Sequence, residues 1–193
     1  MNIALFGGSF NPIHIGHLIT ANFVREEYQL KKIIFVPCFI NPHKKTNYQF
    51  EDANHRLNMI KLSIKDNPYF EVSNYEISKS DISFSIDTIK YFYNLYQEKI
   101  YFIIGYDNYL TLNKWKDIND FSKYCEMIVL TRNNSSFDTN YKPTDDLIIH
   151  FPNTPNIEIS STDIRKRIQV NKSIKYLTSD DVIKYIEKYQ LYK

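Results

Sequence analysis

Two histidines three positions apart, His14 and His17, have the residue types and spacing for chemistry on phosphate groups. They stand where an apolar run gives way to a helical pattern, and side chains with this spacing at a helix start can point the same way. The free N–H groups at such a helix start attract phosphate. We therefore predict a site where both imidazoles stabilise phosphate charge instead of binding a metal. The preceding turn is expected to bring a phosphate-bearing ligand against Gly7, Gly8, Ser9 and Phe10.

A second candidate phosphate site lies near the other end of the chain, in the run Ile159–Arg165, ISSTDIR. Ser161 or Thr162 can cap a helix that begins there. Arg165 would lie one turn into that helix, where its guanidinium can bind phosphate with two hydrogen bonds. Taken alone, such a run is only a good helix start. The residues predicted to bind phosphate beside Arg165 are Ser160, Ser161, Thr162 and Ile164.

The elements that must position these residues alternate along the chain. Apolar runs without alternation predict strands buried on both faces, which are typical of parallel sheets covered by helices. We expect an α/β fold with a Rossmann-like, doubly wound parallel sheet in one domain, 1–193, whose C-terminal helices (about 162–193) complete the site. Strands are expected at 2–6, 32–36, 70–72 (running on towards 76), 100–104, 126–130, and near 147–150 and 157–159; helices at 17–28, 51–66, 86–96, 117–124, 162–170 and 180–189.

In such sheets, ligands bind outside the carboxyl ends of the strands. The turns after Phe6, Val36, Ile104, Leu130 and Ile159 should therefore share one crevice. Two segments, 37–50 and 132–146, are predicted to be loops that could close over a substrate.

Composition supports this assignment. The chain has 193 residues, of which 43% are apolar and 24% are charged, so it is expected to be globular and not membrane-spanning. A net charge of +2 predicts no nucleic-acid partner. The two cysteines show neither metal nor disulfide spacing, which favours a reducing, cytoplasmic location. Only four glycines occur, and we expect all of them around one nucleotide site: Gly7, Gly8, Gly16 and Gly105.

The two terminal motifs resemble the paired signatures, HxGH and ISSTxIR, of the HxGH nucleotidyltransferases. Between them, the chain resembles the bacterial nicotinate-nucleotide adenylyltransferases along essentially its full length. The similar segments are Asn41–Lys44 (the family's PPHK loop), Ser83–Thr88 (SYTxxT), Phe102–Asp107 (FIIGxD), Lys114–Trp115 and Leu130–Arg132.

This resemblance implies a role for each matched residue. Trp115, the only tryptophan, would stack on the pyridine ring, although a lone tryptophan is more often a core residue. The helix start near Ser85 and the backbone near Lys116 would donate hydrogen bonds to the nicotinate carboxylate. Asp107, which follows Gly105, would accept from ribose hydroxyls. Two cations, Lys44 and Arg132, would bind the triphosphate or the developing charge; Lys44 is counted with His14, His17 and Arg165 as catalytic.

The sequence departs from the family pattern at three places. Asn11 stands where the family usually has Asp, and Asn41 where it usually has a first proline. The usual Tyr-Thr pair is replaced by Phe84 and Ser85, but Ser85 keeps a hydroxyl.

The reaction implied by the resemblance is transfer of the adenylyl group of ATP to nicotinate mononucleotide in NAD biosynthesis. It needs no side-chain nucleophile, and Mg²⁺ would be bound mainly by the phosphates, with no protein metal site. The alternatives are a phosphopantetheine adenylyltransferase, an enzyme preferring nicotinamide mononucleotide, and a non-catalytic nucleotide-binding module. Aromatic residues in 91–101 or 185–192 could mark a homo-oligomer interface.

Overall fold

The computed structural model describes residues 1–40, 51–131, 141 and 143–193. Its sheet has six parallel strands in the order β3-β2-β1-β4-β5-β6. The order reverses between β1 and β4, which creates the crevice at the carboxyl ends of a doubly wound sheet. The expected fold class is confirmed. The strands are β1 Ile3–Gly8, β2 Lys32–Pro37, β3 Phe70–Val72, β4 Ile100–Gly105, β5 Cys125–Leu130 and β6 Ile149–His150.

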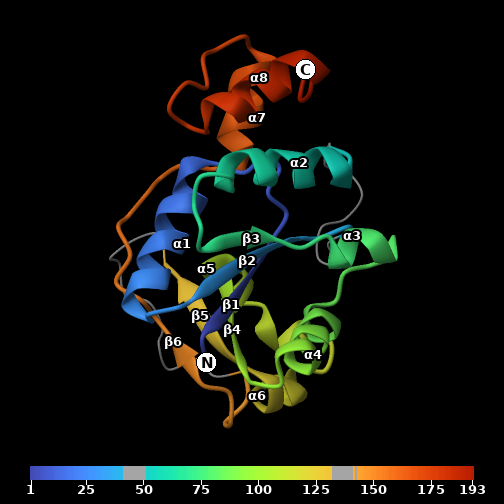
Figure 1. Ribbon diagram of the computed structural model, residues 1–193, viewed down its shortest axis with the longest axis vertical. Helices are drawn as coiled ribbons and strands as arrows, with labels where there is room; N and C mark the ends of the chain where they lie inside the picture. The colour runs from blue at the N-terminus through green and yellow to red at the C-terminus, as the bar shows by residue number, and fades with distance from the viewer. Residues whose placement is uncertain (41–50, 132–140, 142) are drawn as a thin grey trace.

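Helices cover both faces of this sheet, with α1 and α2 on one side and α4 and α6 on the other (Figure 1). Successive strand residues point to opposite faces. Phe35 and Ile103 therefore pack in one core, and their neighbours Ile34 and Phe102 in the other. The helices are α1 Ile15–Glu27, α2 Ala53–Ile64, α3 Tyr75–Lys79, α4 Ser85–Tyr96, α5 Tyr106–Tyr109, α6 Phe121–Tyr124, α7 Ser161–Gln169 and α8 Asp180–Tyr189, with 3-10 turns η1 Leu112–Lys114 and η2 Ile118–Asp120.

Three expected elements differ in the structure. The strand from Phe70 stops at Val72, and α3 follows because Tyr75 N–H donates to Ser73 Oγ (3.1 Å), which turns the chain away from the sheet. The segment 157–159 forms no strand and runs directly into α7. The helix expected at 117–124 is divided into η2 and α6.

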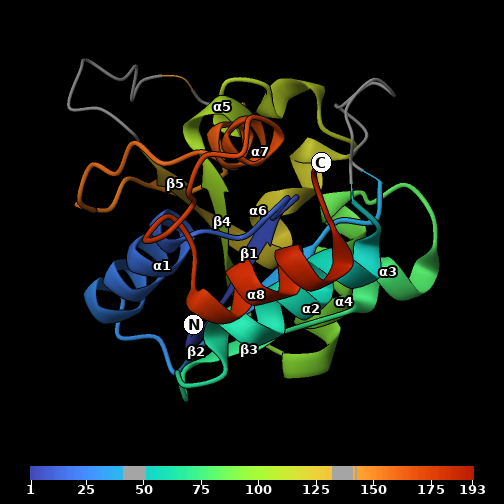
Figure 2. The same cartoon turned by 90° about the horizontal axis from the view of Figure 1, so that it is seen from above.

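In the C-terminal part of the chain, α8 runs alongside α2 (Figure 2). Tyr185 of α8 contributes polar contacts there, with its hydroxyl 3.0 Å from His55 Nδ1 and 3.1 Å from Asn58 Nδ2. This packing brings the chain beyond α8 back towards the end of β1. Within the described ranges, no helix is both long and apolar enough to cross a membrane.

Candidate active site

The first motif turns sharply between the end of β1 and the start of α1. None of the four glycines has a positive φ; the left-handed residue in this turn is Phe10 (φ 46°). The glycines instead permit close packing. A Cβ on Gly8 would lie 2.9 Å from the Phe10 ring, and one on Gly7 would lie 2.9 Å from Phe102.

The two histidines lie together at the start of α1, as their spacing predicts. His14 is the N-cap and only 4% exposed, and its ring stacks on His17 with centroids 3.6 Å apart. The backbone N–H of His14 donates to His17 Nδ1 (3.2 Å). Because Nδ1 accepts this bond, a neutral His17 carries its proton on Nε2. His17 can therefore donate a hydrogen bond from Nε2, the ring nitrogen that does not contact the backbone.

Ser160, and neither Ser161 nor Thr162, is the N-cap of α7, which corrects the expected cap. Its Oγ accepts from Asp163 N–H (3.1 Å) and lies 2.6 Å from Asp163 Oδ2. Ser161 is the first residue of α7, and its hydroxyl donates to the first motif instead.

The second motif is bonded directly to the first. Side chains of Arg165, Ser161 and Thr178 donate to the carbonyl oxygens of three consecutive residues, 11 to 13, at 2.7, 2.8 and 2.9 Å. Arg165 also lies 3.3 Å from Thr162 Oγ1. The C-terminal part of the chain therefore holds the backbone that leads into the two histidines.

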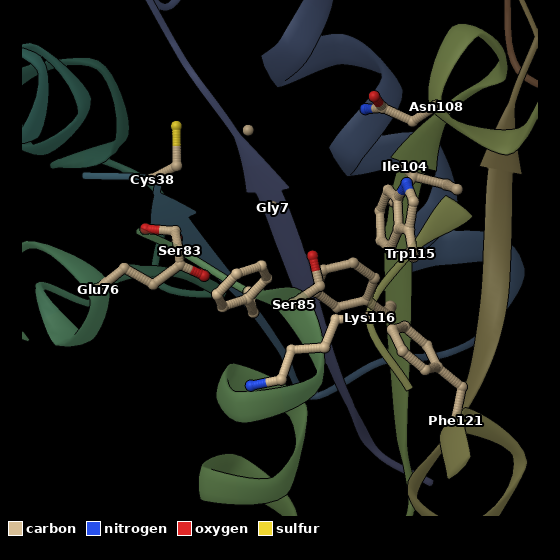
Figure 3. A pocket seen from close by; sticks show the side chains of 13 residues that line it. Gly7, Cys38, Glu76, Ser83, Ser85, Ile104, Asn108, Trp115, Lys116 and Phe121 are labelled. Atoms are coloured by element: carbon tan, nitrogen blue, oxygen red, sulfur yellow. The ribbon is translucent and has the colours of Figure 1, made fainter. Parts of the chain in front are cut away.

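A pocket opens beside Gly7 and Gly8, at the switch point between β1 and β4 (Figure 3). Trp115 forms part of its wall, edge to face with Phe102 and Phe121 at centroid distances of 6.4 and 6.0 Å. The polar groups of the pocket come from α3 (Glu76), from the start of α4 and the residues just before it (Ser85 and Ser83) and from the chain after β4 (Asn108 and Lys116). The lining residues are Gly7, Gly8, Cys38, Glu76, Ser83, Phe84, Ser85, Phe102, Ile104, Asn108, Trp115, Lys116 and Phe121.

The pocket includes some of the residues predicted to bind the nicotinate nucleotide and omits others. Ser85, Trp115 and Lys116 line it. Asp107 does not: it is exposed in the first turn of α5, whose N-cap is Gly105, and the next residue, Asn108, lines the pocket instead. A four-residue helix turns successive side chains in different directions, which sequence spacing could not anticipate.

Five other predicted residues either do not line the pocket or lie outside the described part of the chain. The side chains of Phe10 and Ile164 are buried in the core, so only their backbones could meet a ligand. Lys44 and Arg132 lie outside the described residues, as do Asn41 and the rest of its motif. Gly105 is absent from the pocket lining, although the register that pairs Phe6 with Ile103 sets it level with Gly8.

Comparison with known proteins agrees with this geometry. The cytidylyltransferase-like family matches residues 5–167. A probable nicotinate-nucleotide adenylyltransferase of Caldicellulosiruptor bescii is 44% identical over the whole of both chains, and one from Thermoanaerobacter is 40% identical over 100% of this chain and 95% of its own. The chain belongs to the nicotinate-nucleotide adenylyltransferase family.

A solved structure shares the fold of this family member. The Plasmodium falciparum nicotinic acid mononucleotide adenylyltransferase, complexed with NaAD, superposes with a TM-score of 0.82 at 23% identity, covering 99% of this chain and 97% of that one. At this identity the likeness concerns the fold alone.

Arg56 is a structural residue of this adenylyltransferase site that the sequence analysis missed. Its side chain is 1% exposed. Its nitrogens donate to the carbonyl oxygens of Ser9 (2.8 Å), Cys38 (2.7 Å), Phe39 (3.3 Å) and Glu51 (3.1 Å). It thereby joins the segments that follow β1 and β2. The feature of the sequence that could have identified Arg56 is its position one turn before Ile60, on the apolar face of α2.

We expect Arg56→Lys to lower the free energy of unfolding by about 2 kcal/mol, because a lysine cannot satisfy these carbonyls together. Urea denaturation measures this. Lys61→Arg, the reverse change at an exposed position of the same helix, should stay within about 0.5 kcal/mol of wild type. Equal losses in both variants would contradict the role given to Arg56.

Glu76 is a second missed residue, a buried carboxyl at the pocket wall. Thr88 Oγ1 donates to its Oε1 (2.6 Å). Burial raises the pKa of Glu76 above its usual value of 4.5, although hydrogen bonds from Thr88 and Ser83 and the charges of Lys79 and Arg56 lower it. The folded chain thus holds this proton more tightly than the unfolded chain.

A raised pKa in the folded state means that stability decreases as the pH rises from 4.5 through the folded value. Glutamine has no such titration. We therefore expect Glu76→Gln to gain stability relative to wild type as the pH is raised through the range that begins at 4.5. Urea denaturation across this range, with the exposed Glu187→Gln as control, measures the difference; a difference independent of pH would refute the assignment.

Proposed function

We propose that this chain transfers the adenylyl group of ATP to nicotinate mononucleotide, which yields nicotinate adenine dinucleotide and pyrophosphate. One observation carries the proposal: the Trp115 pocket reaches Gly7 and Gly8, the strand end from which the two-histidine segment begins. A pyridine ring in the pocket and phosphates at α1 would therefore be neighbours. Family membership supports the same reaction.

In the proposed step, a 5′-phosphate oxygen of the mononucleotide attacks the α-phosphorus of ATP in line. The new O–P bond forms as the bond to the bridging oxygen breaks, and pyrophosphate leaves with that electron pair. Catalysis then consists of positioning and charge stabilisation. His17 Nε2–H, His14 and the Arg165 guanidinium are proposed to face phosphate oxygens, with N–H groups at the starts of α1 and α7 and the Gly8–Ser9 backbone.

Mg²⁺ would enter as part of the ATP substrate, held mainly by its phosphates, and would offset their negative charge. In the part of the chain that the structure describes, no three His, Cys, Asp or Glu residues cluster to hold a metal ion. Lys44 and Arg132 remain predictions as further phosphate ligands.

The nicotinate carboxylate is proposed to lie near the start of α4. No side chain caps this helix at Phe84, so its first N–H groups suit a carboxylate. Lys116 adds a cation, with Nζ 4.6 Å from the centre of the Phe84 ring and 3.6 Å from Asp87 Oδ2. Trp115 would pack against the ring; Asp107 or, from its place in the pocket, Asn108 would bind ribose.

We also propose a cytoplasmic location, where ATP is available, and substrates as the main partners, with no role for nucleic acid or membrane. A homo-oligomer stays a prediction, which sedimentation would test. The single-domain organisation also stays a prediction.

The deciding experiment measures pyrophosphate release from ATP with nicotinate mononucleotide, nicotinamide mononucleotide and phosphopantetheine in parallel. We expect the highest kcat/KM with nicotinate mononucleotide. Preference for either other acceptor would overturn the proposed substrate. ATP binding without pyrophosphate release from any of them would indicate a non-catalytic module.

Trp115 permits a direct test of the ring site. Trp115 is the only tryptophan, so the tryptophan fluorescence of the protein should change on titration with nicotinate mononucleotide. We expect Trp115→Ala to raise KM for this substrate about tenfold, the scale of one lost stacking contact, while KM for ATP changes little. An equal rise in both KM values would contradict a ring-specific role.

A further inference from the structure

The side chain of Asn11, next to the phosphate-binding turn, is held by the C-terminal segment. The hydroxyl of Tyr192 donates to Asn11 Oδ1 (2.9 Å), and the backbone N–H of Glu51 donates to the same oxygen (3.3 Å). The backbone N–H of Tyr192 in turn donates to Glu51 Oε1 (2.9 Å). These bonds close a ring of contacts among three residues far apart in the sequence.

The burial and backbone conformation of Tyr192 hold its hydroxyl in place as a hydrogen-bond donor to Asn11. It is only 3% exposed, and its backbone adopts a left-handed φ of 65°, an unfavourable conformation for a tyrosine that surrounding contacts must maintain. Burial and the charge of Glu51 raise the pKa of the Tyr192 hydroxyl, although Arg56 and Arg165 lower it. The proton that Asn11 accepts is therefore kept.

The other side of Asn11 contacts the proposed catalytic arginine, because its carbonyl oxygen accepts from Arg165 Nη1 (2.7 Å). Asn11 is thus bound through its side chain to Tyr192 and through its backbone to Arg165. A shift of the Asn11 backbone would therefore displace the oxygen that holds the Arg165 guanidinium.

We propose that Tyr192 is a positioning residue for adenylyl transfer: its hydroxyl orients Asn11, and through Asn11 it sets the places of Arg165 and the two-histidine segment. This inference rests on the proposed function, since it concerns the same site. Tyr192 itself lies outside the pocket lining.

The structure offers a matched control for the loss of one hydroxyl. Tyr185, one turn before the end of α8, also donates or accepts through its hydroxyl, but its partners His55 and Asn58 belong to α2 and not to the phosphate-binding turn. Tyr185→Phe and Tyr192→Phe each remove one oxygen from the C-terminal packing. A purely structural effect should be similar in both.

We expect Tyr192→Phe to lower kcat about tenfold, equivalent to about 1.4 kcal/mol, with KM for ATP and nicotinate mononucleotide within about twofold, as for an interaction that acts mainly in the transition state. Tyr185→Phe should keep the wild-type kcat. The thermal midpoints of both variants should decrease by similar small amounts. Unchanged kcat in Tyr192→Phe, or equal losses in both variants, would overturn the inference.

A double-mutant cycle tests the path through Asn11 even if one variant is poorly stable. Asn11→Ala combined with Tyr192→Phe should lose no more kcat than Asn11→Ala alone, and Asn11→Asp, which keeps the acceptor oxygen, should restore most of the rate. If the kcat losses of the two single variants multiply in the double variant, or if Asn11→Asp does not restore the rate, coupling between Tyr192 and Asn11 is contradicted. A wild-type chain that releases no pyrophosphate would instead refute the proposed function.

Discussion

His17→Ala is expected to lower kcat for adenylyl transfer by about 10²- to 10³-fold, the cost of removing one preorganised donor to developing charge. The donor is Nε2–H, because Nδ1 accepts the His14 backbone N–H. Alanine also removes the ring that stacks on His14, so that neighbour loses its orientation too.

Stability should change much less than the rate. The His17 ring packs edge to face against Phe6 and Phe10, so its loss leaves a small cavity, and we expect about 1–2 kcal/mol of destabilisation. Rapid-quench kinetics and urea denaturation separate the two effects. His150→Ala is the control, since His150 lies on edge strand β6 and pairs with Glu126; near-normal turnover in His17→Ala would exclude the catalytic role.

Arg165→Lys is expected to lower kcat by about 10²-fold, although the charge is retained. One nitrogen of the guanidinium is committed to the Asn11 carbonyl and another lies near Thr162 Oγ1. These two contacts hold the plane of the guanidinium in one orientation, in which the guanidinium can bind phosphate. A lysine ammonium cannot both keep the Asn11 bond and present a second donor in that plane.

Arg167→Lys provides a control on the same helix. Arg167 is exposed, and its Nε donates to the carbonyl oxygen of Ser173 (2.7 Å), away from the first motif. We expect its kcat to equal that of wild type. Pyrophosphate release under saturating substrates measures both variants, and a common loss of rate would mean that Arg165 acts only through the packing of α7.

Local sequence predicted most strands, but it failed where a short polar segment decided the outcome. Val72 ends β3, and the Ser73 hydroxyl accepts from Tyr75 N–H in the turn into α3, whereas sequence alone favoured a longer strand. Likewise, Ser160, Ser161 and Thr162 are all acceptable caps. The tertiary structure begins α7 at Ser161, whose hydroxyl contacts Pro12, so the cap is Ser160.

The site divides in the same way. The function of the glycines and histidines in the first motif can be predicted from their local spacing, because the strand end and the helix start are adjacent in sequence. Arg56 and Glu76 do not, since an arginine or glutamate within a helix usually faces water. Their significance lies in carbonyl and hydroxyl partners that other segments supply.

The sequence by itself predicted the α/β class and two candidate phosphate-binding motifs, because each depends on residue types at short, regular spacing. Trp115 became the ring-binding candidate only through the resemblance to the family. Only the tertiary structure decided that the second motif and Thr178 donate to the carbonyls of residues 11 to 13, that Asn108 and not Asp107 lines the pocket, and that Tyr192 holds Asn11. The physical reason is that these contacts join residues far apart in the chain, and hydrogen-bond direction is set only when the sheet and helices have packed.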